Sequence, residues 1–237
     1  MIYGAILAGG KGTRMGVTNM PKQFLMLGKK PIIIHTLEQF LINPKIDLVL
    51  VLVPKEWLSH TKDIVKKYIK ENSKIEVIEG GESRNETILR GCQYAKEHSK
   101  DKSDNLIVTH DAVRPFISQR ILDENIEQGL KNDAVDTVIP SADTIVESKD
   151  GQYISNIPVR SEYFLGQTPQ TFSVDGFIEL YNGLTDEEKE ILTDACKIFV
   201  IRGKKVGLVQ GEIYNMKITK IEDLEIAKAI LTKENHD

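Results

Sequence analysis

Cysteine is scarce in this chain, and long apolar runs are absent. The 237 residues contain two cysteines, Cys92 and Cys196, which share no spacing typical of metal ligands. This excludes a disulfide framework and a cysteine-based zinc site, so we expect both thiols to be reduced. No stretch reaches the roughly 18 apolar residues that a membrane span requires, and Met1 leads into a strand-like run without a cationic leader. The sequence therefore predicts a cytoplasmic protein with no membrane partner.

The chain also lacks an extended basic region. Its 31 lysines and arginines stand against 35 acidic residues, which gives a net charge of −4. Nucleic-acid-binding proteins usually present a basic face, so we expect no nucleic-acid partner. Hydrophobic residues make up 41% and charged residues 28%, as in an ordinary globular protein. No repeat or linker divides the chain, and we expect one domain over residues 1–237.

Acidic residues are missing from the first 37 positions. Five lysines and arginines lie in this segment, so the other 200 residues sum to −9. These cations surround a glycine-rich turn, Gly9-Gly10-Lys11-Gly12, that follows an apolar run. A strand leading into such a turn offers backbone N–H groups to a phosphate. The segregated charge predicts a binding site for a small anion.

Two familiar phosphate-binding motifs are nevertheless absent. A Walker loop would need glycine at Ala5 and a hydroxyl residue at Gly12. A dinucleotide fingerprint would need glycine at Met15, and an acidic residue about 20 positions further on to hold a ribose. These failures exclude a Walker-type site and a dehydrogenase. They leave a plain strand-to-helix turn as the alternative to a phosphate site.

Apolar runs and helical patterns alternate along most of the chain. Apolar runs predict strands at residues 2–7, 47–53, 74–78, 105–109 and 134–139. Helical spacing predicts helices at residues 31–41, 57–69 and 83–97. Later segments predict strands at 205–209 and 213–218, a capped helix from Thr185 through Cys196, and a closing helix at 221–231. This order predicts an α/β fold with a mainly parallel, Rossmann-like sheet flanked by helices.

A different pattern precedes these later elements. Short alternating runs at residues 143–147 and 152–157 enclose Asp150-Gly151, a strong hairpin signal. They predict a β-hairpin arm at about residues 141–165 that projects from the sheet. Because an isolated hairpin cannot bury both of its faces, we expect the arm to pack against a second copy and form a homodimer.

Three polar segments directly follow predicted strands. They are residues 9–14, 80–85 and 110–115, and each begins where a strand ends. Ligands of parallel sheets bind at the carboxyl edge, so we expect the three segments to form one site. Their convergence weighs more than any single motif.

Arg14 and Lys22 flank the glycine turn without an acidic neighbour. Such a positive pair can stabilise charge on a phosphoryl group under in-line attack. Ordinary solvated surface charge is the alternative. Asp111, at a predicted strand end, either ligates Mg²⁺ together with phosphate oxygens or caps a turn and pairs with Arg114.

Two further cations stand at less obvious positions. Lys217 lies within an apolar segment, where it either points into a site or protects a sheet edge. Arg160, just after the predicted arm, allows the same two interpretations. The five histidines show no paired spacing, which argues against a metal site or a general base built on them.

Ordered motifs along nearly the whole chain resemble one enzyme family. They are Leu7-Ala8-Gly9-Gly10, Pro21-Lys22-Gln23, Gly80-Gly81, His110-Asp111, Thr168-Pro169-Gln170 and Asn215-x-Lys217. Together they resemble the CTP-dependent sugar-phosphate cytidylyltransferases. The resemblance implies a nucleotide-binding α/β unit whose arm makes a homodimer. It also implies Mg²⁺ as cofactor, with CTP and a polyol phosphate as substrates.

The resemblance further implies roles for individual residues. Catalysis would rest on Arg14, Lys22, Arg160 and Lys217, with Asp111 at the metal. CTP would bind to Leu7, Ala8, Gly9, Gly10, Gly81, Glu82, Ser83, Arg84, Asn85, Glu86 and Thr87. Arg114 and Thr168 would position the acceptor. Arg160 would serve the site of its own subunit or that of the neighbouring one.

Two branches of this family differ in their acceptor. The features that most resemble the branch that uses ribitol 5-phosphate are Val113, Pro158-x-Arg160 and Thr193-Asp194-Ala195-Cys196-Lys197-Ile198-Phe199. Members that use methylerythritol 4-phosphate commonly have Asp before Asn-x-Lys, where this chain has Tyr214. We therefore expect cytidylyl transfer from CTP to ribitol 5-phosphate, giving CDP-ribitol for wall teichoic acid or a related polymer. The alternatives are the methylerythritol 4-phosphate reaction of isoprenoid synthesis and a nucleotide-binding regulator without activity.

Overall fold

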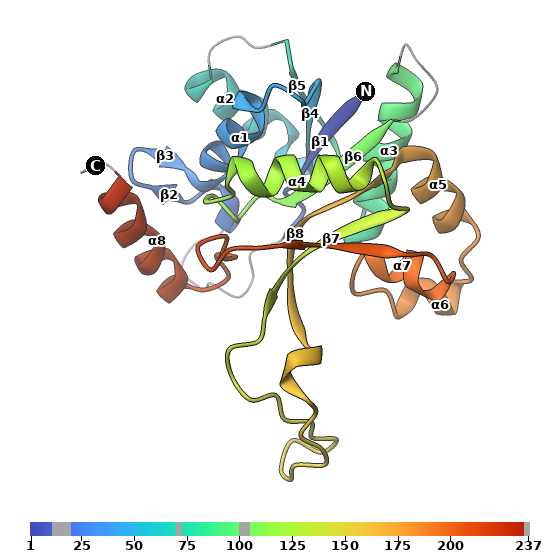
Figure 1. The fold of residues 1–237 in the computed structure, drawn as a ribbon. Helices are drawn as coiled ribbons and strands as arrows, with labels where there is room; N and C mark the ends of the chain where they lie inside the picture. The colour runs from blue at the N-terminus through green and yellow to red at the C-terminus, as the bar shows by residue number, and fades with distance from the viewer. Residues whose placement is uncertain (11–19, 70–72, 100–104, 235–237) are drawn as a thin grey trace.

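A seven-stranded sheet runs through the centre of the computed structural model (Figure 1). The structure describes residues 1–10, 20–69, 73–99 and 105–234. In spatial order the strands are β5 (Ile75–Glu79), β4 (Leu48–Val53), β1 (Ile2–Leu7), β6 (Leu106–Asp111), β8 (Phe164–Ser173), β7 (Ala134–Pro140) and β9 (Val206–Gln210). Within this sheet β8 runs antiparallel to both of its neighbours, and the other pairings are parallel. The mainly parallel α/β fold predicted from the sequence is confirmed.

Helices cover both faces of the sheet, as parallel strands require. One face carries α1 (Ile32–Ile42), α2 (Leu58–Tyr68) and α4 (Gln119–Gly129), and the other carries α3 (Arg84–His98), α5 (Val174–Asn182) and α7 (Cys196–Ile201). Alternate residues of β4 enter the two cores, with Val49 and Val51 on the α1 side and Leu50 and Leu52 on the α3 side. The run at 48–53, within the strand predicted at 47–53, is continuously apolar for this reason. In the described ranges, no helix is both long and apolar enough to cross a membrane.

A two-stranded ribbon and the C-terminal helix close one end of the sheet. The ribbon pairs β2 (Met26–Leu27) with β3 (Lys30–Pro31), and α8 (Ile221–Glu234) packs on it. Buried Leu27 of the ribbon shares a core with Leu224 of the helix. Gly28 makes the ribbon turn with φ of 62°, a left-handed conformation that favours glycine.

The strand predicted at residues 213–218 is wrong. This segment has no sheet partner among the residues that the structure describes. One of its backbone contacts is the N–H of Ile218, which donates to the carbonyl oxygen of Val113 at 2.9 Å. The apolar residues that suggested a strand divide between two environments, because Ile218 is buried whereas Ile213 is 81% exposed. The segment is therefore a loop held by contacts that are distant in sequence.

The single helix predicted from Thr185 through Cys196 is also wrong. The chain forms α6 (Asp186–Glu190), then a break, then α7. Thr185 and Glu188 make the expected capping box at the start of α6. The carboxylate of Asp194 then accepts a hydrogen bond from the N–H of Cys196 at 2.8 Å, which satisfies a free donor at the start of a second helix.

Residues 141–163 form the arm, which projects from the ends of β7 and β8 (Figure 1). Its tip is the predicted turn, where Gly151 has φ of 73° and the Asp150 carboxylate accepts the N–H of Gln152 at 2.9 Å. The regular strands predicted on either side are wrong, because residues 141–163 contain one isolated bridge, between Glu147 and Asn156. The two branches of the arm have no third strand to pair with among the described residues. A two-stranded hairpin is only marginally stable by itself, so the pairing between the branches stays limited to this one bridge.

Candidate active site

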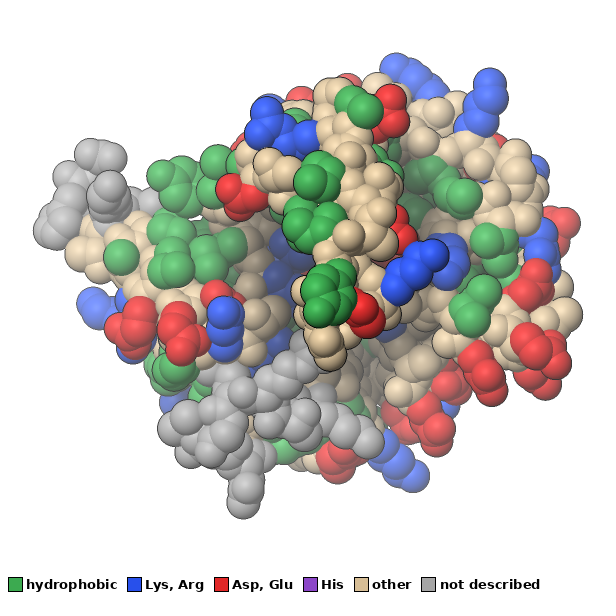
Figure 2. Space-filling view, turned by 90° about the horizontal axis from the view of Figure 1, so that it is seen from below, with side chains coloured by type: hydrophobic (Ala, Val, Ile, Leu, Met, Phe, Trp, Pro, Cys, Tyr) green, Lys and Arg blue, Asp and Glu red, His purple; other side chains and the backbone are tan. Residues whose placement is uncertain are grey.

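The ends of β1 and β6 and the loop after β5 border a cavity of about 280 Å³. Its described lining residues are Leu7, Ala8, Gly9, Gly10, Lys22, Gln23, Gly81, Glu82, Ser83, Arg84, Thr87, Asp111, Ala112, Val113 and Lys217. Figure 2, which views the molecule from below, shows Lys and Arg side chains deep in a recess beside the arm. The described parts of the three polar segments therefore meet at one edge of the sheet, as predicted.

The first turn of α3 builds the loop after β5. The hydroxyl oxygen of Thr87 accepts from the Gly81 N–H at 3.0 Å, and the hydroxyl donates to the carbonyl oxygen of Ser83 at 2.8 Å. Ser83 caps the helix by accepting from the Glu86 N–H at 3.1 Å, and the Glu86 carboxylate accepts from the Glu82 N–H at 3.0 Å. A Cβ on Gly81 would lie 2.8 Å from the backbone carbon of Glu86, so this approach requires glycine.

Lys22 reaches the cavity from the start of the 3₁₀ helix η2 (Lys22–Phe24). The next residue, Gln23, is buried, and its Nε2 donates to the carbonyl oxygen of Ala8 at 2.7 Å. The ring of Phe24 lies 5.2 Å from that of Trp57, which ends the 3₁₀ helix η3 (Lys55–Trp57). The first contact ties the segment of Lys22 to the residues that follow β1, and the second ties it to the residues that follow β4.

Asp111 is the ionic centre of the cavity. Its carboxylate lies 3.0 Å from Nζ of Lys217 and 3.2 Å from Nε of Arg114. A guanidinium nitrogen of Arg84 is 3.6 Å away. Burial alone raises the pKa of Asp111, but the three cations outweigh burial and hold the pKa well below its ordinary value. Three cations around one carboxylate leave a surplus of positive charge, which suits an anionic ligand.

His110 and Thr168 fix the backbone of Asp111. Nε2 of His110 lies 3.1 Å from the carbonyl oxygen of Arg114, which can only accept, so Nε2 carries the proton. Nδ1 then accepts from the Thr168 hydroxyl at 2.8 Å, and the Thr168 oxygen accepts from the Asp111 N–H at 3.2 Å. Burial lowers the pKa of His110 to about 4. The ring is therefore neutral near pH 7 and has a structural role.

Arg114 lies buried behind the cavity and holds the segment that carries Lys217. Its Nη1 donates to the carbonyl oxygen of Asn215 at 2.7 Å. Nδ2 of Asn215 in turn donates to the carbonyl oxygen of Thr168 at 2.7 Å. These bonds place Lys217 beside Asp111 although residues 213–218 form a loop and not a strand.

Most of the predicted site residues are thus brought together. Of those predicted to bind CTP, Asn85 and Glu86 stand outside the lining residues, since Asn85 is buried and Glu86 supports the loop. Arg114 and Thr168 are buried behind Asp111 and hold neighbouring groups in place. Arg14 lies outside the described residues.

Arg160 lies apart from the other predicted catalytic residues. It begins the 3₁₀ helix η4 (Arg160–Glu162) on the arm, and its Nη1 donates to the carbonyl oxygen of Ala142 at 3.0 Å. This bond joins the two branches of the arm near its base. Arg160 does not belong to the described lining of the cavity in its own chain.

Two glutamines contribute to the site in ways that the sequence did not indicate. Gln23 joins the segment of Lys22 to Ala8, and Oε1 of Gln170 accepts from Nη1 of Arg84 at 3.3 Å. Both belong to motifs visible in the sequence. A motif does not reveal, however, which group a glutamine amide will contact.

Comparisons with known proteins agree on one family. The model of the family described as IspD, 2-C-methyl-D-erythritol 4-phosphate cytidylyltransferase, matches residues 2–233. A ribitol-5-phosphate cytidylyltransferase of Lactiplantibacillus plantarum is 52% identical over 235 residues, which cover 99% of this chain and 100% of the relative. One from Streptococcus pneumoniae (strain Hungary19A-6) is 50% identical with the same coverage.

A solved structure confirms the likeness in three dimensions. The crystal structure of 4-diphosphocytidyl-2C-methyl-D-erythritol synthase from Anaerococcus prevotii has a TM-score of 0.80 to this chain at 27% identity, covering 98% of this chain and 96% of that one. Family model, relatives and structure all extend over nearly every residue. The chain therefore belongs to the IspD family of cytidylyltransferases, which are nucleotidyltransferases.

Proposed function

We propose that the protein transfers a cytidylyl group from CTP to ribitol 5-phosphate, giving CDP-ribitol and pyrophosphate. The observation that carries this proposal is 52% identity, over the whole chain, to a relative named for that acceptor. The structure named for the methylerythritol acceptor shares the fold at 27% identity. Tyr214, in place of the Asp common in methylerythritol enzymes, supports the same choice. We place the reaction in the cytoplasm and its product in the synthesis of wall teichoic acid or a related polymer.

The reaction is an in-line displacement at the α-phosphorus of CTP. A phosphate oxygen of ribitol 5-phosphate forms the new P–O bond while the bond from the α-phosphorus to the α,β-bridging oxygen breaks. Pyrophosphate leaves with that electron pair. Because the second pKa of a phosphate monoester is about 6, the nucleophile is already ionised near neutral pH. No general base is required, which is consistent with a neutral, hydrogen-bonded His110.

Catalysis then rests on orientation and on charge neutralisation. Lys22 stabilises the charge that develops around the α-phosphorus, and Lys217 positions the acceptor phosphate. Both lysines line the same cavity, and the ion pair with Asp111 directs Lys217. Arg14 shares the role of Lys22, as the family resemblance implies.

Mg²⁺ would supply further neutralisation of phosphate charge when bound. The donor chemistry fits, because the low pKa keeps the cavity-lining Asp111 ionised and a triphosphate offers the remaining oxygens. Oδ2 of Asp111 contacts Arg114 and Lys217, whereas Oδ1 faces Arg84 at the longer distance of 3.6 Å. Asp111 would therefore be the side chain that holds the cation.

A homodimer through the arm completes the proposal. Apolar side chains exposed on the arm and at its base are Val146, Tyr153, Ile154, Ile157, Val159, Tyr163, Phe164 and Leu165. Hydrophobic side chains on the projecting arm are visible in Figure 2. A run of exposed apolar groups on a projecting segment marks an interaction surface, and a second copy would cover it. We assign Arg160 to the cavity of that second copy.

Pyrophosphate release tests the proposal directly. Purified protein is incubated with CTP and Mg²⁺, and with ribitol 5-phosphate or methylerythritol 4-phosphate as the acceptor. ATP in place of CTP serves as the nucleotide control. We expect release with CTP and ribitol 5-phosphate, together with CDP-ribitol by mass spectrometry. Release with methylerythritol 4-phosphate but not with ribitol 5-phosphate would show that methylerythritol 4-phosphate is the acceptor. No release with either acceptor would favour a nucleotide-binding regulator without activity.

A further inference from the structure

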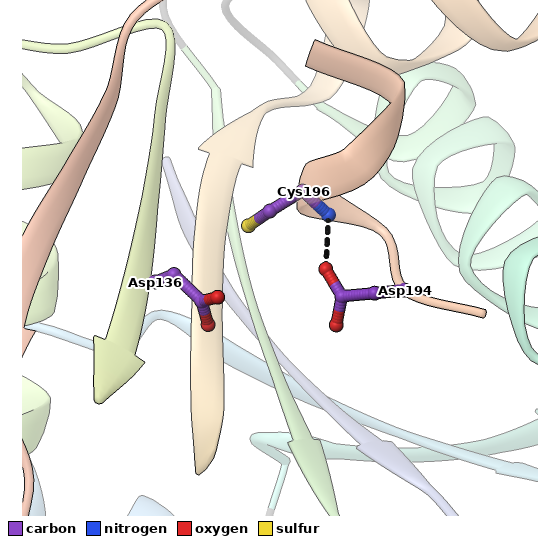
Figure 3. A group of neighbouring side chains, drawn as sticks. All are labelled: Asp136, Asp194 and Cys196. Atoms are coloured by element: carbon purple, nitrogen blue, oxygen red, sulfur yellow. Dashed lines mark hydrogen bonds between the residues drawn. The ribbon is translucent and has the colours of Figure 1, made fainter. Parts of the chain in front are cut away.

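Two carboxylates and a thiol meet on the sheet face that α7 covers. Asp136 comes from β7, Asp194 from the loop just before α7, and Cys196 from the first position of α7 (Figure 3). One ligand atom from each residue lies within 4.8 Å of the others, as in a metal site. Burial, and then the charges of Asp136 and Asp194, raise the pKa of Cys196 well above its ordinary value. The Cys196 thiol donates to the carbonyl oxygen of Val135 at 3.7 Å, and both carboxylates accept hydrogen bonds from the amide of Gln170, so contacts within the chain already account for the cluster.

The amide of Gln170, on β8, joins the two carboxylates. Its Nε2 donates to Oδ1 of Asp136 at 3.0 Å and to Oδ2 of Asp194 at 2.7 Å. Both hydrogens of the amide nitrogen are thereby used. Reversing the amide would place its oxygen against two negatively charged acceptors, which is unfavourable at a partly buried site. The two carboxylates therefore determine which end of the amide faces them.

The other end of the amide faces the cavity wall. Oε1 of Gln170 accepts from Nη1 of Arg84 at 3.3 Å, and Nη2 of Arg84 faces Asp111 at 3.6 Å. The Arg84 side chain lines the cavity and is 28% exposed. A guanidinium has more N–H donors than these two contacts use, so Arg84 can still donate to a ligand.

We propose that Asp136 and Asp194 are positioning residues for nucleotide binding: by orienting the Gln170 amide, they hold the guanidinium of Arg84 where it contacts bound CTP. The inference rests on the proposed function, because it takes CTP as the occupant of the cavity. It adds β7 and α7, which lie outside the cavity lining, to the elements that set nucleotide affinity. A held guanidinium loses less conformational freedom when the nucleotide binds.

A double-mutant cycle tests this role. The variants are Asp136→Asn, Arg84→Ala and the double variant, and calorimetry gives the CTP dissociation constant of each. An asparagine amide offers both donor and acceptor, so Gln170 loses its preferred orientation in Asp136→Asn. We expect CTP to bind about fivefold more weakly to Asp136→Asn and about tenfold more weakly to Arg84→Ala. The double variant should bind no more weakly than Arg84→Ala.

Kinetics separate positioning from a general effect on the fold. In Asp136→Asn the KM for CTP should rise with the dissociation constant, while kcat and the KM for ribitol 5-phosphate change less than twofold. Asp123→Asn is the matched control. Asp123 lies on α4, on the other face of the sheet from the Gln170 amide, and its carboxylate pairs with Lys45 at 3.3 Å. It should leave CTP binding unchanged. If Asp136→Asn does not fold, Asp194→Asn replaces it in the same cycle.

Two results would overturn the inference. One is an Asp136→Asn variant that folds and binds CTP as tightly as the unmodified protein. The other is an equal fold loss of CTP affinity when Asp136→Asn is introduced into the unmodified protein and into Arg84→Ala. That result would show that the carboxylate acts on CTP binding by a route other than Arg84. The cycle needs no acceptor, so a protein that binds CTP but forms no CDP-ribitol would contradict the proposed transfer without altering this result.

Discussion

Lys217 and Asp111 form an ion pair in which one partner is buried and the other half-exposed. Nζ of Lys217 lies 3.0 Å from Oδ2 of Asp111, and the two side chains are 41% and 10% exposed. The carboxylate is already shared with Arg114, at 3.2 Å, so it is not left unpaired when the lysine turns away. Lys217 is therefore the partner that can exchange this contact for a phosphate in the cavity.

Replacing Lys217 by methionine should weaken binding of the acceptor more than binding of the nucleotide. The change keeps the apolar stem and removes the ammonium, so we expect the KM for ribitol 5-phosphate to rise about tenfold, which corresponds to about 1.4 kcal/mol. CTP affinity, measured by calorimetry, should change less than twofold. Lys228→Met on α8, which removes an exposed lysine paired with Glu225 at 2.8 Å, is the control and should have no effect. A larger effect on CTP than on the acceptor would contradict the assigned role.

Replacing Lys22 by alanine should reduce turnover far more than nucleotide binding. A charge that acts on the reacting phosphorus stabilises the transition state more than the bound substrate. Losing one such group typically lowers kcat by about 100-fold or more. We expect a loss of that order in steady-state kcat, with the CTP dissociation constant raised less than threefold. If kcat and affinity fall by equal factors, Lys22 contributes only uniform binding.

The cavity could be predicted from the sequence because its parts follow strands of the parallel sheet. The run at 2–7 is the observed β1, and each later polar segment follows a strand whose direction is set by the βαβ order. The arm turn was equally predictable, since Asp150-Gly151 is a local signal. Such features depend on residues that are neighbours in the chain.

Features that depend on distant partners could not be predicted. Residues 213–218 resemble a strand locally, but a bond from Arg114 to Asn215, 101 positions away, holds them as a loop. Gln170 likewise gains its role from Asp136 and Asp194, which lie 34 and 24 positions away outside its own strand.

Two helices were missed for a different reason. The helices α4 and α5, which no sequence pattern had identified, do begin at capping serines, Ser118 and Ser173.

Asp136 should make the stability of the protein depend on pH. Burial, followed by the charge of Asp194, raises the pKa of Asp136 from 3.8 to about 6. Between pH 4 and pH 6 Asp136 is protonated in the folded protein but ionised in the unfolded chain. Its contribution to the free energy of unfolding therefore falls as pH rises from about 4 to 6. The loss is at most about 3 kcal/mol.

Asp136→Asn removes that dependence. We measure the free energy of unfolding in urea for both proteins. As pH rises from 4 to 6, the value for the variant should increase relative to that of the unmodified protein. Asp123→Asn, at an exposed carboxylate, is the control for the loss of one negative charge. Parallel stability curves for the unmodified protein and Asp136→Asn would show that the pKa of Asp136 is not raised.

Mixing two inactive variants should restore activity if Arg160 serves the partner subunit. Arg160→Ala and Lys22→Ala are each expected to be nearly inactive. In a mixed dimer, one site combines the intact Lys22 of one chain with the intact Arg160 of the other. After random exchange about a quarter of all sites should be active, because half of the dimers are mixed and each holds one complete site.

The outcome separates the two possible assignments of Arg160. If Arg160 acts within its own chain, both sites of every mixed dimer lack one residue, and mixing restores nothing. The geometry favours the partner, since Arg160 is bonded to Ala142 on the arm and stands outside the described lining of its own cavity. A protein lacking residues 143–159 should then sediment as a monomer and fail to rescue either variant. Full activity of that monomer would remove both the dimer and the shared site from the mechanism.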